Sequence, residues 1–448
     1  MNYVIIGLGT AGVYATRYIS SIDRNADITI IEKNRYESYS PCGIPFIIEK
    51  GESLELLKHP FPRTKRINVL INHEVIEIDN KERKIIVKNL QNGEKLEIFY
   101  DKLLFSAGAE PLIPRIKNAN EYLGNGVFVI KRLEDAENLI EYIRGKSIKH
   151  VSVIGAGPIG LEMAYSMKSF GLNVSVFEML PQVFPRSLDP DMAFEVEKFL
   201  TGNGIKIYLS SPVEEIVVDG EKVVGIKSNN NFYSSEAVIL SAGFRPNTEL
   251  LKNMVDMERS FIIVDDHMRS SDPNIYAAGD NIIVKNMISG EKTVFQIATV
   301  AAKQGMVAGI NMAGKEAIYT GTTLTFVSKI GSLEIASTGL TETEASKKYR
   351  VFSARARGLN RPKYTGGTEI LLKLICDENG KILGAQGMGE LSSQKINVIS
   401  MAIRKNSTVM DILANEMGYC PEVSELYDIT NMAADLLIKK LNISKYIF

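Results

Sequence analysis

A single cysteine, Cys42, follows Pro41 in the stretch YESYSPCGIPF, residues 36–46. Positions 37 and 47 hold Glu37 and Ile47, so neither offers a second thiol for a local disulfide. A helix that begins near Pro41 would place Cys42 at its N-terminus, where the helix dipole lowers the pKa of a thiol. The stretch therefore predicts a reactive thiol that bonds to a substrate sulfur or is oxidised to a sulfenic acid.

A glycine-rich turn near the start of the chain, GLGTAG at residues 7–12, predicts a dinucleotide-binding unit. Gly7 makes the tight turn, Gly9 lets a pyrophosphate approach the backbone, and Gly12 lets helix and strand pack closely. The phosphate would lie at the positive end of the following helix. Glu32 ends the next strand, where its carboxylate can accept hydrogen bonds from ribose hydroxyls. The elements expected here are strands over 3–6 and 28–31 and a helix from the turn to about residue 21.

The same unit returns in the middle of the chain, with GAGPIG at residues 155–160 and an acid, Glu178, at the end of the second strand. One such turn is a weak signal, but two copies, each closed by an acid, predict two bound dinucleotides. Glu178 would repel a 2′-phosphate, which favours NADH over NADPH at the second site. The elements expected here are strands over 150–154 and 174–177 and a helix over 161–170.

Two further segments, 100–109 and 242–247, lie where each nucleotide-binding unit should end, and 274–280 reads as a strand that ends in small residues and one acid, Asp280. Together with the two turns and the cysteine, they make the chain resemble the flavin-dependent pyridine nucleotide–disulfide oxidoreductases over essentially its whole length. The resemblance implies an α/β fold with two Rossmann-like domains of the glutathione-reductase type and a C-terminal α+β dimerisation domain. The implied ranges are 1–110 with 245–320 for FAD, 111–244 for NAD(P)H and 322–448 for the interface domain.

The resemblance also implies which residues contact the cofactors. A helix beginning at Ala298 would point its N-terminus at the flavin and stabilise negative charge there. The expected FAD residues are Gly7, Gly9, Thr10, Ala11, Gly12, Glu32, Lys33, Val75, Ser106, Ala107, Gly108, Gly279, Asp280, Ala298 and Thr299. The expected NAD(P)H residues are Gly155, Gly157, Pro158, Ile159, Gly160, Glu178 and Gly243. In the C-terminal domain we expect strands over 322–329 and 369–377, a hairpin turn at Asn379-Gly380 and a helix over 393–405.

Two absences place the chain in the single-cysteine branch of this family. Disulfide reductases of the glutathione and lipoamide type carry a C-x4-C pair beside the flavin, and a histidine–glutamate pair near the C-terminus. Here Cys42 stands alone, and no histidine follows His267. The branch includes CoA-disulfide reductases, NADH oxidases, NADH peroxidases and polysulfide reductases. Hydride would pass from NAD(P)H through FAD to the sulfur bonded to Cys42.

Within that branch, several positions bear on the acceptor. Peroxidases and oxidases usually carry a histidine where this chain has Thr10, and a tyrosine where it has Pro158. These departures count against a peroxidase and less strongly against an oxidase. Tyr364 and Tyr419 match the tyrosines with which CoA-disulfide reductases reach the partner subunit's active site. Packed interface tyrosines are the alternative interpretation.

Glu162 would lie near the nicotinamide and the flavin, with orientation as its expected role and a surface helical position as the alternative. A substrate pocket is expected from Tyr14, Tyr18, Ser38 and Pro41, with Arg357 and Arg361 as phosphate-binding groups for CoA. A solvated basic face is the alternative for the arginines. The expected activity is reduction of CoA disulfide or a persulfide or polysulfide; the alternative is an NADH oxidase that forms hydrogen peroxide or water.

The composition limits the remaining classes of function. The chain has 448 residues, 52 basic and 53 acidic side chains, and a net charge of −1, which argues against nucleic acid or an anionic membrane as partner. Three cysteines form no disulfide framework, and a cytoplasmic homodimer is expected. Cys376 is expected in the core, whereas Cys420 is a candidate to pair with Cys42 of the other subunit. With four histidines and no CxxC or HExxH motif, no metal site is expected.

Overall fold

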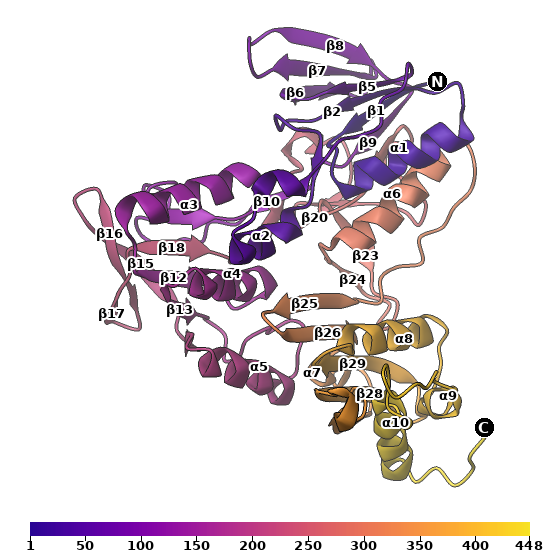
Figure 1. The fold of residues 1–448 in the computed structure, drawn as a ribbon. Coiled ribbons are helices and arrows are strands. Elements are labelled where there is room, and N and C mark those ends of the chain that lie inside the picture. Colours follow the sequence, from indigo (N-terminus) through magenta and orange to yellow (C-terminus); the bar gives the residue numbers. More distant parts are fainter.

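Two parallel sheets carry the two glycine turns (Figure 1). In the computed structural model, which describes residues 1–448, the first sheet has the strand order β22-β9-β1-β2-β5. Its central strands are almost continuously apolar and buried, as expected for a parallel sheet covered on both faces. The strands are β1 (Asn2–Ile6), β2 (Asp27–Ile31), β5 (Ile67–Leu70), β9 (Lys102–Phe105) and β22 (Ile275–Ala277). Since β22 comes from residues far along the chain, the second nucleotide unit is inserted into the first.

The second sheet repeats this arrangement with the order β11-β18-β12-β13-β14. Its strands are β11 (Val127–Val129), β12 (His150–Ile154), β13 (Asn173–Phe177), β14 (Lys206–Tyr208) and β18 (Ala237–Leu240). Helix α3 (Leu133–Lys146) and helix α5 (Pro190–Gly202) belong to this unit. The two units are joined by an antiparallel pair of short strands, β10 (Ala109–Pro111) and β19 (Phe244–Pro246).

Antiparallel strands extend each unit. The first unit carries β6 (His73–Asp79), β7 (Lys84–Asn89) and β8 (Lys95–Phe99); the second carries β15 (Val213–Asp219), β16 (Lys222–Ser228) and β17 (Asn231–Ser234). A further sheet of β20 (Met257–Glu258), β21 (Phe261–Ile263), β23 (Ile282–Lys285) and β24 (Lys292–Thr293) lies in the returning part of the first unit. None of these added strands pairs with β1 or β12, which keep parallel neighbours on both sides.

Helices α1 (Thr10–Ile22) and α6 (Ala298–Met312) lie side by side on the first sheet (Figure 1). Their backbones touch because two glycines of α6 have no side chains. A Cβ atom on Gly305 would lie 2.2 Å from the carbonyl oxygen of Ala11, and one on Gly309 would lie 2.6 Å from that of Ala15. The close approach brings the N-terminal ends of both helices to the same edge of the sheet.

The C-terminal domain is an antiparallel sheet with helices on it (Figure 1). The strand order is β25-β26-β29-β28-β27, from β25 (Phe326–Ile330), β26 (Leu333–Gly339), β27 (Val351–Leu359), β28 (Glu369–Asp377) and β29 (Ile382–Met388). Helices α7 (Glu342–Ala345), α8 (Ser392–Arg404), α9 (Val409–Ala414) and α10 (Ile429–Lys440) complete it. The expected strand over 369–377 is confirmed, as is the expected helix, with its start at Ser392. The strand expected over 322–329 starts only at Phe326, because the hydroxyls of Thr323 and Thr325 bond to each other and to Ser400.

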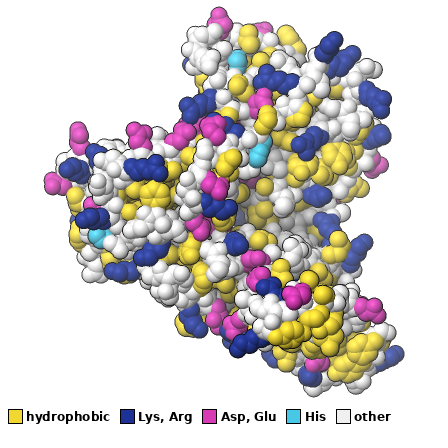
Figure 2. Space-filling model, viewed as in Figure 1, with side chains coloured by type: hydrophobic (Ala, Val, Ile, Leu, Met, Phe, Trp, Pro, Cys, Tyr) yellow, Lys and Arg dark blue, Asp and Glu magenta, His cyan; other side chains and the backbone are white.

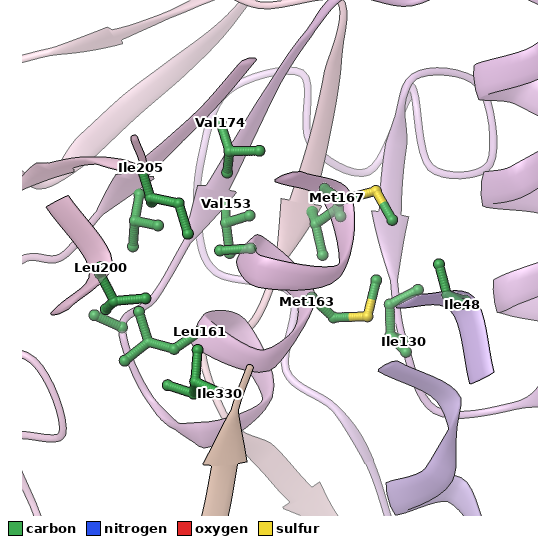
Figure 3. Close-up of a cluster of buried hydrophobic side chains, with 14 of the residues drawn as sticks. Ile48, Ile130, Val153, Leu161, Met163, Met167, Val174, Leu200, Ile205 and Ile330 are labelled. Carbon is green, nitrogen blue, oxygen red and sulfur yellow. The ribbon is translucent and has the colours of Figure 1, made fainter. Parts of the chain in front are cut away.

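One apolar core crosses all three domains around helix α4 (Pro158–Ser169), as Figure 3 shows. Met163 and Met167 of this helix face Ile48 of helix α2 (Ile44–Lys50), while Leu161 faces Ile330 at the end of β25. These side chains are almost fully buried. The domains are therefore fixed against one another by a shared core rather than by surface contacts alone.

The surface carries acidic and basic side chains interspersed, and the face in Figure 2 is hollowed where the three domains meet. Hydrophobic side chains gather on this face over the C-terminal domain. The exposed apolar residues of that domain include Val398, Met401, Val423, Leu426, Tyr427, Leu436, Ile447 and Phe448. None of the helices combines the length and the apolar character needed to cross a membrane.

The contact between α1 and α6 gives a test of the fold by two identical substitutions. Gly305→Ala should destabilise the protein by about 1–3 kcal/mol, because its methyl group would be forced into the backbone of Ala11. Gly145→Ala, in helix α3, has open space around the new methyl group and should stabilise by up to about 1 kcal/mol. Thermal unfolding followed by circular dichroism measures both. Equal effects of the two substitutions would contradict the close approach.

Candidate active site

The first glycine turn is shaped by backbone contacts that exclude side chains. Gly7 has a φ of +93°, and a Cβ atom there would lie 2.4 Å from the carbonyl oxygen of Ser106. A Cβ atom on Gly12 would lie 2.1 Å from the carbonyl oxygen of Gly7, so the turn and the helix meet at van der Waals distance. Gly9 has no atom within 4 Å of a Cβ position, which leaves open space for a ligand.

The second turn has the same geometry. Gly155 has a φ of +107°, a Cβ atom on Gly160 would lie 2.1 Å from the Gly155 carbonyl oxygen, and Gly157 faces open space. Helices α1 and α4 begin directly after Gly9 and Gly157, and no side chain caps either N-terminus. The first N–H groups of α1, and those that follow Pro158 in α4, are therefore free to bind phosphate oxygens. Both turns fit the pyrophosphate of a dinucleotide.

The two acids expected to bind ribose occupy matching positions. Glu32 accepts hydrogen bonds from the backbone N–H of Leu8 at 2.8 Å and of Asn34 at 2.8 Å. Glu178 accepts from the N–H of Ala156 at 2.8 Å and of Leu180 at 2.9 Å. Burial raises the pKa of Glu32, although these N–H groups and the nearby Lys131 act in the opposite direction. Each carboxylate is thus held at the edge of its glycine turn.

A third segment meets the first turn at Gly279 and Asp280. Gly279 has a φ of +95°, its N–H donates to Gln304 at 2.8 Å, and a Cβ atom on it would lie 3.5 Å from the side chain of Ala11. Burial raises the pKa of Asp280, partly offset by Lys131. Asn281 has a buried side-chain oxygen without a hydrogen-bond partner. Polar atoms without full partners beside an open glycine turn fit a bound polyol such as the ribitol chain of FAD.

The remaining residues expected around the nucleotides lie in varied settings. Ala298 and Thr299 are exposed at the start of α6, and Gly243 has a φ of +105° with open space around it. Ser106 bonds to the carbonyls of Ile6 and Gly7, and Asn247 contacts the carbonyl oxygens of both Ala107 and Gly108. Val75 is buried in β6, whereas Lys33 is largely exposed and pairs with Glu74 at 2.7 Å. Thr10 and Ala11 open helix α1, and Pro158 and Ile159 open helix α4.

Cys42 lies in a short 3₁₀ turn, Pro41–Gly43, that precedes helix α2. The expected helical start at Ser40 or Pro41 coincides with this 3₁₀ turn, whereas the α-helical part, α2, begins only at Ile44. The expected lowering of the thiol pKa is wrong for the protein alone. Although the side chain is exposed, surrounding protein desolvates the thiolate and raises the pKa of Cys42, and the carboxylates of Glu162 and Asp280 act in the same direction.

Helix α4 connects the cysteine segment to the second glycine turn. Ser166, which is fully buried, donates to the carbonyl oxygen of Pro45 at 2.7 Å and of Glu162 at 2.9 Å. Glu162 lies 2.6 Å from the hydroxyl of Ser328 in β25. Burial raises the pKa of Glu162 to about 7, although the Ser328 hydroxyl and the Lys329 N–H lower it. Glu162 therefore changes charge near neutral pH, between the two nucleotide units and the C-terminal domain.

Several residues of this region carried no sequence signal. Ser166 lies in an ordinary helix, Ser328 in an ordinary strand and Lys131 in the bend before α3, and only the fold brings them to the site. Lys131 is half-buried and donates to the carbonyl oxygen of Ala109, and desolvation lowers its pKa. His59 lies 2.8 Å from the hydroxyl of Ser40, two residues before the cysteine, on a strand paired with Ser38. The only sequence signal for a role of His59 near Cys42 is that the chain has just four histidines.

Tyr364 and Tyr419 lie together on the surface of the C-terminal domain, away from contact with Cys42 in the same chain. Their loops are joined by the hydroxyl of Thr365, which donates to the carbonyl oxygen of Pro421 at 2.8 Å. Tyr364 is 78% exposed and Tyr419 is 49% exposed. Local desolvation raises the pKa of Tyr364, and the neighbouring Tyr419 adds to that effect. Two phenols exposed side by side are available to a second subunit.

The residues expected to bind substrate divide into two groups. Tyr14 and Tyr18 lie on α1 and are half-buried; Ser38 and Pro41 flank the cysteine segment. Arg357 instead pairs with Glu195 at 2.6 Å and also with Glu369, and Arg361 lies 3.3 Å from Glu390. Both arginines are thus engaged by carboxylates of their own chain. Cys376 is fully buried, as predicted, and Cys420 is exposed.

Comparison with known proteins identifies the family to which this site belongs. Residues 1–305 match the family described as pyridine nucleotide-disulphide oxidoreductase, and residues 325–430 match its dimerisation domain. An NADH oxidase of Methanocaldococcus jannaschii is 40% identical over 99% of this chain and 100% of its own. An NAD(P)H coenzyme A polysulfide/persulfide reductase of Pyrococcus horikoshii is 32% identical over 95% of this chain and 96% of its own.

The structural comparison agrees. A water-forming NADH oxidase from Lactobacillus brevis, solved with NADH bound, has a TM-score of 0.92 at 30% identity, covering 99% of both chains. Fold and site therefore define a two-dinucleotide flavoprotein, and the chain belongs to the FAD-dependent pyridine nucleotide–disulfide oxidoreductases. It is an enzyme whose cofactors are FAD and NADH or NADPH.

The charges around Cys42 give a test on flavin-free protein. Replacing Glu162 with Gln removes a negative charge that disfavours the thiolate, so the pKa of Cys42 should fall. The pH dependence of iodoacetamide labelling, read by peptide mass spectrometry, measures the midpoint at Cys42 separately from Cys420. The exposed Glu55→Gln variant should leave the midpoint in place. A labelling midpoint of Cys42 that is unchanged or higher in Glu162→Gln would contradict the inference that the Glu162 carboxylate raises the pKa of this thiol.

Proposed function

We propose that the enzyme uses NAD(P)H to reduce a sulfur–sulfur bond, in CoA disulfide or a persulfide or polysulfide, through the single thiol of Cys42. The observation that carries this proposal is the position of Cys42. It is an exposed thiol at the junction of the two nucleotide units, joined through Pro45 and Ser166 to the helix of the second glycine turn. No second cysteine lies beside it, so the partner sulfur must come from a substrate.

The proposal assigns FAD to the first turn and NAD(P)H to the second. FAD would be held by the turn at residues 7–12, by Glu32 and by Asp280, with α6 pointing its N-terminus toward the flavin. NAD(P)H would be held by the turn at 155–160, by Glu178 and by Gly243. The open glycine positions and uncapped helix ends described above support both assignments. Bound FAD would supply the two-electron link between NAD(P)H and the sulfur attached to Cys42.

The protein's own residues supply the thiol chemistry. The thiolate of Cys42 attacks the disulfide R–S–S–R, a bond forms between the two sulfurs, and RS⁻ leaves. The leaving thiolate takes a proton, for which the phenols of Tyr364 and Tyr419 of the partner subunit are the proposed donors. Two electrons and one further proton then return the thiolate of Cys42 and release a second RSH. NADH, one proton and R–S–S–R thus give NAD⁺ and two RSH.

The proposed assembly is a homodimer in which the C-terminal domain of each subunit completes the site of the other. The match to a dimerisation domain and the exposed apolar surface of this domain support it. Tyr14, Tyr18, Ser38 and Pro41 would line the substrate pocket. Because Arg357 and Arg361 are paired internally, binding of CoA phosphates by them would require exchange of those ion pairs.

Oxygen is the second candidate acceptor. The relatives from Methanocaldococcus jannaschii and Lactobacillus brevis are both named NADH oxidases. In that reaction the thiol of Cys42 would cycle through a sulfenic acid or only shield the flavin. Thr10, where a histidine is usual, favours the sulfur substrates over oxygen.

The acceptor can be tested by NADH consumption in oxygen-free solution with CoA disulfide or polysulfide. Turnover should be fast in the native enzyme and fall by about 10³-fold or more in Cys42→Ser, since the hydroxyl is a poor nucleophile without an adjacent base. Cys420→Ser should keep the activity, which would show that Cys420 is not needed as a partner of Cys42. If the native enzyme consumes NADH only after air is admitted, oxygen is the acceptor and the sulfur proposal fails.

Coenzyme preference tests the second nucleotide site. Glu178→Ala removes a buried negative charge from the expected position of the ribose 2′ group. The ratio of kcat/KM for NADH to that for NADPH should fall by about tenfold, which corresponds to about 1.4 kcal/mol. Glu221→Ala, on an exposed turn of the same domain, should leave the ratio unchanged. An unchanged ratio in Glu178→Ala would contradict the assignment of NAD(P)H to the second glycine turn.

A further inference from the structure

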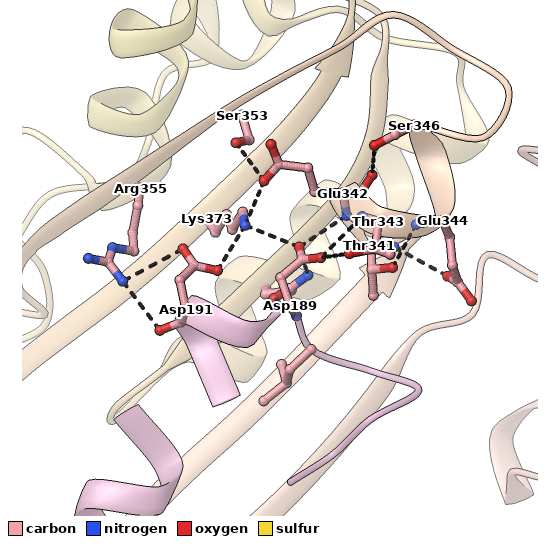
Figure 4. Close-up of polar contacts among 12 residues, drawn as sticks. Asp189, Asp191, Thr341, Glu342, Thr343, Glu344, Ser346, Ser353, Arg355 and Lys373 are labelled. Atoms are coloured by element: carbon pink, nitrogen blue, oxygen red, sulfur yellow. Dashed lines mark hydrogen bonds and ion pairs between the residues drawn. The ribbon is translucent and has the colours of Figure 1, made fainter. Parts of the chain in front are cut away.

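Lys373 lies in the middle of strand β28 and contacts three carboxylates, two of which come from the NAD(P)H domain (Figure 4). Its Nζ atom is 3.2 Å from Asp189, 2.9 Å from Asp191 and 2.8 Å from Glu342. The lysine side chain is 5% exposed and that of Asp189 is 2% exposed. Burial disfavours the ammonium, but bonds from Glu342 and Asp191 outweigh it and raise the pKa of Lys373. The cation is therefore permanent at physiological pH.

Asp189 is fixed from every side by the C-terminal domain. Its backbone N–H donates to Gln386 at 2.9 Å, and the Gln386 amide donates back to its carboxylate at 2.7 Å. The same carboxylate accepts from the N–H of Glu342 at 3.0 Å and of Thr343 at 3.3 Å, the first residues of α7 (Figure 4). Asp189 thus makes a reciprocal pair with a strand and caps a helix of another domain.

Asp189 also ends the loop that follows Glu178. This loop, residues 179–188, contacts the second glycine turn, since the N–H of Phe184 donates to the carbonyl oxygen of Ala156 at 2.9 Å. The ring of Phe184 packs against Phe326 of β25, with centroids 5.8 Å apart. Both fixed points of the loop, Phe184 and Asp189, therefore contact the C-terminal domain.

We propose that Lys373 is a positioning residue for NAD(P)H, which holds the 179–188 loop in place against the second glycine turn by anchoring Asp189. The proposal rests on the assignment of NAD(P)H to that turn. It makes nucleotide binding depend on a residue of the C-terminal domain that does not touch the nucleotide. Without the ammonium, three carboxylates would face one another at the joint, and the buried charge of Asp189 would lose its only cationic partner.

The test is Lys373→Met in the FAD-loaded enzyme, since methionine keeps most of the volume and removes the charge. With ferricyanide as electron acceptor, the KM for NADH should rise about tenfold or more, with kcat within about twofold. Calorimetric titration with NAD⁺ should show the same loss of affinity. Trypsin should cleave faster after Arg186, the exposed basic residue of the loop, and mass spectrometry measures that peptide. Lys198→Met on α5, a largely exposed lysine, is the matched control.

Unchanged NAD⁺ affinity, KM and cleavage in Lys373→Met would overturn the proposal. If that variant does not fold, Gln386→Leu removes the reciprocal bonds to Asp189 while keeping the lysine, and the same three measurements apply. The ferricyanide assay does not involve sulfur chemistry, so failure of the disulfide reaction leaves this test intact. If Glu178→Ala leaves NAD⁺ affinity unchanged while Lys373→Met lowers it, the assigned nucleotide position is at fault and the anchor proposal falls with it.

Discussion

The placement of helix α4 is the constraint on which the rest of the site depends. One end of this helix forms the second glycine turn, its middle carries Glu162, and Ser166 binds the carbonyl oxygen of Pro45 beside the cysteine segment. Its other neighbours are the apolar side chains of α2 and β25. A buried hydrogen bond of this kind contributes only about 1 kcal/mol, but leaving the carbonyl without a partner costs about 1–3 kcal/mol. The main effect of this bond is orientation, because it attaches the cysteine segment to the helix that begins at the second glycine turn.

Electrostatics at the site depends on that support as well. Desolvation by the surrounding protein disfavours the thiolate of Cys42, and the carboxylates of Glu162 and Asp280 act in the same sense. The protein alone therefore keeps the thiol protonated more strongly than a free cysteine. Glu162 loses its negative charge below about pH 7. The protonation of Cys42 therefore depends on a carboxyl group from another domain. Reactivity at Cys42 is thus a property of the assembled domains and not of its own segment.

The parts of the fold that could be predicted from sequence are those that depend on neighbouring residues. The two glycine turns, their flanking strands and helices, and the positions of Glu32 and Glu178 follow from local sterics, because any side chain at Gly12 or Gly160 would collide with backbone. The strand over 369–377 and the helix near 393–405 could be predicted as well, because their sequence patterns are also local.

The rest required contacts between distant residues. Ser328 meets Glu162 across 166 positions, and Lys373 meets Asp191 across 182. A serine in a strand or a lysine in an apolar strand has no local sign of such a partner. The raised pKa of Cys42 could not be foreseen because its causes, desolvation and the carboxylates of Glu162 and Asp280, come from other segments. The late start of β25 has the same origin, since Ser400 from helix α8 bonds the threonine hydroxyls before it.

The apolar core shared by three domains has a consequence for how such a chain can change over time. Its side chains come from α2 in the first unit, from α4 and its sheet in the second, and from β25 and β29 in the C-terminal domain. A nucleotide-binding unit transplanted from another protein would bring the correct turn but the wrong surface for Ile48 and Ile330. The units are alike in design yet not interchangeable, so coenzyme preference can change most readily by replacement of single residues within this fixed frame.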